Sequence, residues 1–427
     1  MTRQIPSQND GCPECAEVGT LNRRRFLQAL GVTGAAVAAT PVLSARAAYA
    51  AGAYSGPILL VISLRGGMDG LSLVPPVGDP DYARKRPNIA IPTSTAIPTG
   101  NPTFGLHPAL APLQPLWNDG RLAFVHAVGS PDASRSHFSA TDELERAAPG
   151  TSIRTGWLDR VLGVAGTGTT FEAVALGTGG VPRLMSGPNE ALGLASLATF
   201  KLQSLDWVGP RLTTALRTLH DNATLPHAAA ATATLDALDT AASVVTNHAG
   251  PRNGAVYPKN SSLGAALADA AALIRANVGL QALAVDVGDW DMHSGLGNRG
   301  EGAFAVKAGD IAASLAAFAT DLGESFNRVT VVTLSEFGRR VQENGSGGVD
   351  HGYGNAVLLA GGGLVGTKVH GTWPTLADAK LDHGDLAGTT DFRNVLGEYL
   401  VKRAGLTTSQ LGTVFPGVTP SFVGAFR

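Results

Sequence analysis

The sequence of 427 residues has few cysteines, few aromatic residues and almost no net charge. Its formal charge is −2, so it lacks the basic surface of nucleic-acid-binding proteins, and we expect no nucleic-acid partner. Aromatic residues make up only 6% of the chain, which argues against a surface that stacks bases. Both cysteines, Cys12 and Cys15, lie in the first fifty residues, so the remainder has no thiol nucleophile, thiolate ligand or disulfide.

Two common catalytic motifs are also missing. No Gly-x-Ser-x-Gly sequence occurs, which disfavours a standard α/β-hydrolase. No Gly-x-Gly-x-x-Gly sequence follows the first expected strand, so nicotinamide binding has no support. The glycine-rich segment 361–368 resembles a phosphate-binding loop, but its lysine comes one position late and no Ser or Thr follows it. We interpret this segment as a turn after a strand.

The first fifty residues have the pattern of an export signal. Three arginines, Phe and Leu occupy 23–27, an alanine-rich apolar run covers 29–40, and a small-x-small site ends at Ala50. This pattern predicts a twin-arginine-type signal peptide over 1–50, the twin-arginine export machinery as a partner, and a periplasmic or secreted protein. The alternative is an uncleaved anchor, but the run is shorter than the roughly 20 residues that span a bilayer. We expect no later transmembrane segment.

Short apolar segments alternate with helical patterns along the rest of the chain. The expected strands are 57–64, 122–128, 171–176, 280–287, 329–334 and 356–360, and the expected helices are 108–118, 207–220, 263–277, 304–322 and 392–404. The Ala/Thr-rich segment 227–250 is either a helix or a surface insertion. Such alternation predicts an α/β fold with a largely parallel sheet that is covered on both faces.

Histidine and carboxylate side chains follow several of the expected strands. They are Asp69, Asp291 and His293, Glu336, Asp350 and His351, and later His383. Folds of this class place their chemistry in loops beyond the carboxyl ends of strands. Carboxylates and neutral imidazoles bind Zn²⁺, Mn²⁺ and similar ions, and such an ion can activate a hydroxyl and stabilise the leaving group of an ester. The pattern therefore predicts metal-assisted hydrolysis of an anionic ester.

Ser136 opens an expected helix after the second strand. A hydroxyl at a helix N-terminus gains from the local dipole, so Ser136 is predicted to attack the ester or to position a metal-bound water, with Arg135 clamping the anion. Glu336 is either a ligand or a general base. Structural interpretations stand beside these: Ser136 as a helix cap and Asp69 as a turn residue. Only the recurrence of such groups at strand ends favours a shared site.

Eight short motifs carry a resemblance to a known family. They are Arg-Gly-Gly-Met-Asp-Gly-Leu (65–71), Gly-Leu-His-Pro (105–108), Arg-Ser-His-Phe (135–138), Gly-Trp-Leu (156–158), Trp-Asp-Met-His (290–293), Ser-Glu-Phe-Gly-Arg (335–339), Asp-His-Gly (350–352) and Thr-Asp-Phe-Arg (390–393). In this order they resemble the exported bacterial family catalogued as domain of unknown function 1501. The resemblance runs from about residue 56 to near the C-terminus, and a twin-arginine leader is usual in that family.

That family is similar to the alkaline phosphatase and sulfatase superfamily, as a distant relative. The resemblance implies a three-layer α/β/α sandwich with a largely parallel central sheet, one such domain over 51–427, and a helical insertion around 207–278. It also implies a divalent metal ion, which we leave open as Zn, Mn, Mg or Ca. Ser136 matches the nucleophile position. The matching candidate ligands are Asp69, Asp291, His293, Asp350, His351 and His383.

Two positions depart from the superfamily pattern. Its first strand ends on a ligand aspartate, whereas Leu64 and Arg65 stand here and Asp69 comes later. Its Ser-Asp-His-Gly motif corresponds here to a segment in which Phe337 replaces a histidine and offers no ligand atom. Two functions therefore remain: an exported metal-dependent hydrolase of phosphate or sulfate esters, or a non-catalytic exported binding or assembly protein on a degenerate fold.

Overall fold

A large mixed sheet forms the centre of the computed structural model, which describes residues 54–202, 209–220, 228–248 and 250–427. The predicted signal peptide and both cysteines lie outside the described residues. The strands are β1 (Ile58–Leu64), β2 (Ile97–Pro98), β3 (Gly105–Leu106), β4 (Leu122–Gly129), β5 (Ala173–Leu176), β6 (Leu192–Leu194), β7 (Ala282–Val287), β8 (Val329–Leu334), β9 (Asn355–Gly361), β10 (Lys368–His370) and β11 (Thr390–Asp391). Nine of them form one sheet in the order β10-β4-β9-β8-β1-β7-β5-β6, with β11 also pairing with β4.

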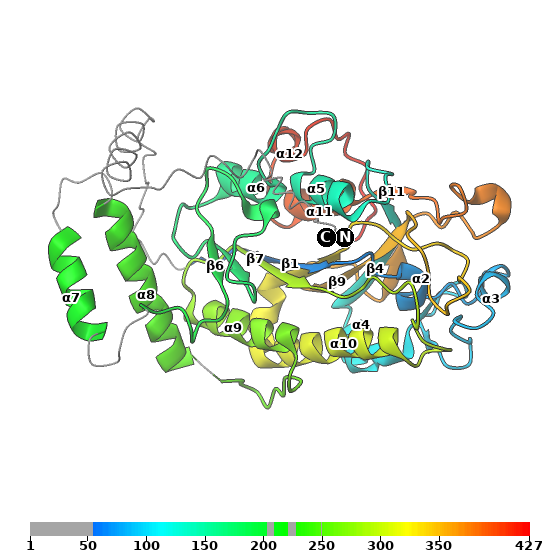
Figure 1. Cartoon of the computed structure of the whole chain (residues 1–427), viewed down its shortest axis with the longest axis horizontal. Coiled ribbons are helices and arrows are strands. Elements are labelled where there is room, and N and C mark those ends of the chain that lie inside the picture. The colour runs from blue at the N-terminus through cyan, green and yellow to red at the C-terminus, as the bar shows by residue number, and fades with distance from the viewer. Residues whose placement is uncertain (1–53, 203–208, 221–227, 249) are drawn as a thin grey trace, which may run out of the picture. The chain divides into compact units, whose positions relative to one another are not determined.

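Helices cover both faces of this sheet. The α-helices are α2 (Gly70–Leu73), α3 (Tyr82–Lys85), α4 (Gln114–Asn118), α5 (His137–Arg146), α6 (Trp157–Ala165), α7 (Gly209–His220), α8 (Ala228–His248), α9 (Ser262–Ala276), α10 (Ala303–Leu322), α11 (Phe392–Lys402) and α12 (Thr408–Val414). Short 3₁₀ helices are η2 (Pro108–Leu113), η3 (Arg183–Met185), η4 (Gly323–Arg328) and η5 (Asp378–Lys380). Figure 1 shows α4, α9 and α10 on one face, and α5, α6, α11 and α12 on the other.

The sequence of β1 explains why two helical layers are needed. All seven of its residues are buried, and successive side chains of a strand point to opposite faces. Ile58, Leu60 and Ile62 therefore enter the core that includes α9 and α10. Leu59 and Val61 enter the core that includes α6, α11 and α12. The continuous apolar run is the signature of a central strand covered on both sides, and the predicted three-layer α/β/α sandwich is confirmed.

Most neighbouring strands are parallel, as the sequence predicts. Within the nine-stranded sheet the exception is β9, which runs antiparallel to both β4 and β8. The separate pair β2 and β3 is also antiparallel. The bounds of the six expected strands agree with the structure to within two residues. The segment 361–368 forms the turn between β9 and β10, and the segment 227–250 contains α8. The short strands β6, β10 and β11 and the helices α6 and α12 were not predicted from the sequence.

The described residues belong to one compact unit, in which α9 contacts β5, β7 and α10 while α8 contacts α7 and α9. Parts of the predicted insertion, 203–208, 221–227 and 249, lie outside the described residues. Counted on to Arg328, α10 is long and apolar enough to cross a membrane by length and composition, which the sequence analysis did not expect. Half of its most apolar window is buried and it packs against η2 and α9, as a core helix does.

Candidate metal centre

Loops at the carboxyl ends of three neighbouring strands form the floor of a candidate metal centre. Ser63, next to last in β1, pairs in register with Asp286 of β7 and with Leu334 of β8. The three loops that follow these strands therefore leave the same edge of the sheet. The Trp290 amide donates to the Arg65 carbonyl oxygen at 3.1 Å, which ties two of the loops together. A Cβ atom on Gly66, at φ +111°, would lie 2.7 Å from the Asp291 nitrogen. Glycine is therefore required for this close approach.

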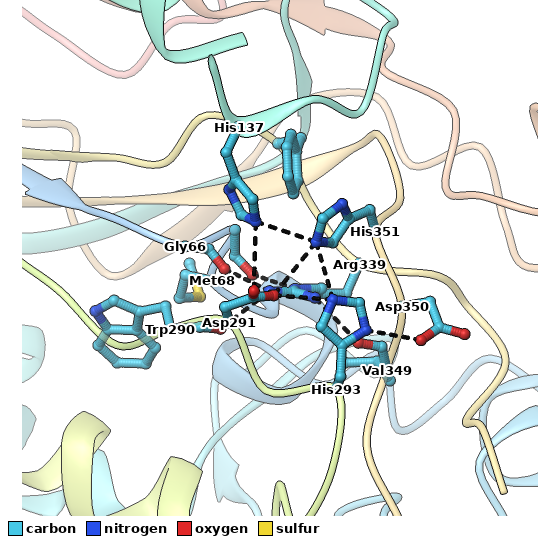
Figure 2. A network of polar contacts seen from close by, with 12 residues as sticks. Gly66, Met68, His137, Trp290, Asp291, His293, Arg339, Val349, Asp350 and His351 are labelled. Carbon is cyan, nitrogen blue, oxygen red and sulfur yellow. Dashed lines mark hydrogen bonds and ion pairs between the residues drawn. The ribbon is translucent and has the colours of Figure 1, made fainter. Parts of the chain in front are cut away.

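Four side chains converge above this floor (Figure 2). His137, Asp291 and His351 have ligand atoms within 4.8 Å of one another. The Nε2 atoms of His137 and His351 are 3.1 Å apart, and the Asp291 carboxylate lies 3.5 Å and 3.3 Å from them, respectively. The Nε2 atom of His293 lies 3.0 Å from that of His351 and 3.1 Å from Asp291 Oδ1. Adjacent ligands about 2.1 Å from one ion are separated by roughly 3.0 to 3.4 Å, so the contacts among His137, Asp291 and His351 suit one coordination shell.

Carboxylates fix the orientation of two of the imidazoles. Glu336 Oε1 lies 2.8 Å from His137 Nδ1 and also accepts the Gly66 amide proton at 2.8 Å. Asp350 Oδ1 lies 2.8 Å from His293 Nδ1. The pKa of Asp350 is lowered, chiefly by its hydrogen bond with His293, so the carboxylate is ionised near neutral pH. Because a carboxylate oxygen can only accept, Nδ1 of each ring must carry a proton. In a neutral imidazole this leaves the Nε2 atom with a lone pair.

The third imidazole is oriented by a main-chain carbonyl. The oxygen of Arg135 lies 3.0 Å from His351 Nδ1 and can only accept, so His351 also carries its proton on Nδ1. Burial lowers the pKa of His351, and this favours its neutral form. Three bare Nε2 atoms therefore face a small region together with a carboxylate. Lone pairs 3.0 to 3.1 Å apart repel one another, and a cation between them removes the repulsion. The residues fit a divalent metal ion.

Arg339 holds the carboxylate side of the centre. Its guanidinium is fully buried and donates from Nη2 to Asp291 Oδ1 at 2.6 Å. It also donates to the carbonyl oxygens of Gly67 at 2.5 Å and Val349 at 3.1 Å, so it joins three loops. Burial raises the pKa of Asp291, but Arg339, His293 and His351 together lower it, and the net shift is downward. Asp291 is therefore ionised, with Oδ1 on Arg339 and Oδ2 turned toward His137.

The structure brings Asp291, His293 and His351 together, and it places the other predicted ligands in different surroundings. Asp350 contacts the centre through His293, as an orienting group. Asp69 is fully buried, and both its carboxylate oxygens accept from the guanidinium of Arg86, at 2.5 and 3.0 Å. His383 is 88% exposed, and its ring lies 3.7 Å from Asp382 rather than in the cluster.

The residues predicted to act in catalysis also have defined places. Ser136 is the N-cap residue of α5, and within the described part of the chain its hydroxyl makes no capping hydrogen bond. The guanidinium of Arg135 donates from Nε to the buried Asp385 at 2.6 Å, so it is paired within the protein. Arg135 has a φ of +55°, and its carbonyl is directed toward His351. Glu336 is buried and orients His137, so its observed contact is with a ligand.

His137 is a candidate ligand that was not predicted from the sequence. The motif Arg-Ser-His-Phe contains it, but the preceding serine drew the functional interpretation. Its ring packs 4.8 Å from the ring of Phe337, which also lies 4.8 Å from His351. Phe337, which offers no ligand atom, therefore serves as an apolar wall that limits the positions of two imidazoles. A histidine at the first position of a helix after a strand is the signal that was available.

Comparisons with known proteins come from three sources. The family model described as "Protein of unknown function (DUF1501)" matches residues 126–393. No curated protein matches the sequence. Three similar solved structures are the lipoteichoic acid synthase LtaP from Listeria monocytogenes (11% identity, TM-score 0.33, 72% of this chain and 66% of that one), the alkaline phosphatase PafA (12%, 0.32, 68% and 64%) and the sulfatase PsFucS1 from Pseudoalteromonas sp. (15%, 0.29, 72% and 62%).

The chain thus spans slightly less than two thirds of the length of each of these three proteins. The family match covers more than half of the chain and contains His137, Asp291, His293, Arg339 and His351, which together form the centre described above. It also contains Glu336 and Asp350, which orient two of the imidazoles. The chain belongs to the DUF1501 family.

Proposed function

We propose that this protein is an exported, metal-dependent hydrolase of phosphate or sulfate esters. The observation that carries the proposal is the convergence of three imidazole Nε2 atoms and one carboxylate, with each Nδ1 atom bound to a fixed acceptor. Acceptors of this kind are the usual outer partners of metal-ligating histidines. The export part of the proposal rests on the twin-arginine-type pattern of residues 1–50.

The donor set favours a transition metal over magnesium or calcium. Imidazole nitrogens together with one carboxylate suit Zn²⁺ or Mn²⁺, whereas Mg²⁺ and Ca²⁺ bind mainly oxygen. A bound dication would polarise a phosphoryl or sulfuryl oxygen and stabilise the leaving group. His137, Asp291 and His351 would hold it. His293, which contacts His351 and Asp291, would lie beside these ligands. Metal-ligating imidazoles are neutral, so only one negative ligand would contact the ion directly, and the ion could still bind an anionic oxygen.

The chain supplies further groups around the place where an anionic ester would bind. A cavity of about 550 Å³ lies beside the centre and is lined by His137, Asp291 and Arg65 among others. The Arg65 guanidinium lies 2.5 Å from Glu145 and 2.9 Å from Asp286, which hold it in one orientation. Ser136 directly precedes the ligand His137, and its hydroxyl is the candidate nucleophile. Ser136 would attack the ester or position the attacking water, and Arg65, already paired with two carboxylates, would form part of the cavity wall.

Metal content and ester turnover test the proposal with two matched histidine variants. His351→Ala removes a central ligand, whereas His383→Ala removes an exposed histidine outside the cluster. We expect the wild type and His383→Ala to bind one Zn²⁺ or Mn²⁺ and to hydrolyse p-nitrophenyl phosphate or sulfate. His351→Ala should lose both properties. Absence of bound metal in the loaded wild type, or turnover that Ser136→Ala and His351→Ala both leave unchanged, would reject the proposal.

The second candidate is a non-catalytic exported binding or assembly protein. The observation that favours it is the engagement of Asp69, whose two oxygens are both bound by Arg86. Metal bound at the centre without turnover of either ester would select this candidate.

A further inference from the structure

The cavity beside the centre has one wall made by a single face of α5. Phe138, Thr141, Asp142 and Glu145 all line it, and their spacing of three, one and three residues places them along one side of a helix. His137, at the start of the same helix, points its ring into the centre. The helix that supplies a ligand therefore also supplies the surface on which the rest of a bound molecule would lie.

Phe138 is the unusual residue of this wall. Its side chain is 91% exposed, the highest value among the large hydrophobic residues that the structure describes. Covering an apolar ring with another apolar surface removes it from water and lowers the free energy. An exposed aromatic ring directly beside a ligand-bearing position is therefore suited to contact a substrate.

The charged groups of the cavity are already paired. Arg65 is bound by Glu145, and Arg183 from η3 lies 2.7 Å from Asp142. Because both guanidinium groups are neutralised, the cavity has no surplus of positive charge away from the metal centre. An anion would therefore bind at the centre, and the surface left for the remainder of the molecule is the ring of Phe138 and the side chain of Thr141.

We propose that Phe138 determines specificity by stacking on an aromatic ring carried by the anionic ester. This inference rests on the proposed function for the anionic end of the substrate. Aromatic pairs prefer offset-stacked or edge-to-face arrangements and contribute beyond the area that they bury. The cavity volume of about 550 Å³ is in the range of sites for small organic molecules. The substrates would be aryl phosphates or aryl sulfates.

Binding of two phosphonates to the full, metal-loaded chain tests this inference without relying on turnover. Phenylphosphonate offers both the anion and the ring, whereas methylphosphonate offers only the anion. We expect the wild type to prefer phenylphosphonate, and Phe138→Ala to weaken that ligand about three- to ten-fold while leaving methylphosphonate unchanged. Phe138→Tyr keeps the ring and should retain the preference. Val306 is an exposed apolar residue in a different helix, α10, and Val306→Ala should bind both phosphonates as the wild type does.

The variants are expected to fold, because the Phe138 ring is exposed and alanine is a good helix former. A wild type that shows no preference for phenylphosphonate, or a Phe138→Ala variant that weakens both ligands equally or neither, would overturn the inference. Phe138-dependent binding in a protein that hydrolyses no ester would support the inference and reject the hydrolase. Ester turnover with the same preference for aryl substrates in wild type and Phe138→Ala would support the hydrolase and reject the inference.

Discussion

Replacement of Glu336 by glutamine isolates the effect of one negative charge on metal binding. Glu336 is only 4% exposed, and its Oε1 atom accepts from the Gly66 amide and from His137 Nδ1, each at 2.8 Å. Glutamine has the same shape and keeps an oxygen for both bonds. Its new NH₂ group would face Ser335 Oγ, 3.2 Å from the present Oε2. That oxygen can accept, because its own proton is directed to the Leu64 carbonyl at 2.7 Å.

The expected cost therefore falls on the metal and not on the fold. A carboxylate on Nδ1 makes the ligating imidazole a stronger base, and loss of such a partner weakens metal binding about 10- to 100-fold. This corresponds to about 1.4 to 2.7 kcal/mol of binding free energy. Because Glu336 is buried and little screened by water, we expect Glu336→Gln to fall in the upper part of that range.

Competition with a chromophoric chelator measures the affinity, and urea unfolding of the metal-free protein measures the stability. The control is Glu324→Gln, which removes an exposed carboxylate in η4 that bonds Asn327 and changes the net charge equally. The control should bind metal as the wild type does. If Glu336→Gln bound zinc within about two-fold of the wild type, the idea that His137 is a ligand held by Glu336 would be refuted.

Three further substitutions test other parts of the structure. Asp350→Asn should weaken metal binding less than Glu336→Gln does, in the same chelator assay, because the Asp350 side chain is 57% exposed. Asp69→Asn breaks the buried pair with Arg86 and should cost about 3 kcal/mol in urea unfolding without changing metal affinity. Burial raises the pKa of Asp69, whereas Arg86, Ser72 and Arg339 lower it, and the net shift is downward. The stabilisation by the ionised carboxylate is therefore present above the ordinary pKa of 3.8 and is lost as pH falls through the lower folded value. The deficit of the variant should shrink in acid. Glu398→Gln should destabilise the fold by about 2 kcal/mol in thermal or urea unfolding, because the buried carboxylate accepts from Lys402 and from the four amides of residues 423–426.

The sequence was sufficient to predict which strands would supply the centre. Five successive apolar residues, 58–62, mark β1 as a buried strand, and β8 is apolar except for Thr330 and Thr333. Parallel pairing brings the carboxyl ends of the two strands to one edge. Asp291 and His293 follow β7 closely, so their distance from the β1 loop is set by the register of the sheet. His351 is farther along the chain, yet it returns to the centre because Arg339 and His351 form an antiparallel bridge. Strand order and loop length therefore determine that these residues meet.

Other features of the site depend on contacts that no local pattern reveals. Asp69 looks like a ligand in sequence because it follows a strand, but the buried guanidinium of Arg86 lies seventeen positions later and binds both its oxygens. The choice between Ser136 and His137 depends on the direction in which α5 begins. That direction is fixed by the left-handed backbone of Arg135 and by the carboxylate of Glu336, which is 199 residues away from His137. Neither constraint has a sequence signature.

The charges around the centre match a dication. Three carboxylates contact the ligand group: Asp291 directly, Glu336 through His137 and Asp350 through His293. One buried guanidinium, that of Arg339, contacts Asp291, and the imidazoles are neutral when Nδ1 carries the only proton. The group thus has two more negative than positive charges, and the charge of Glu336 is buried, where a charge is costly unless it is paired. A single divalent ion balances them, whereas protonation of two imidazoles would place like charges about 3 Å apart. The arrangement of acceptors behind the histidines therefore argues for a metal ion independently of any resemblance to other proteins.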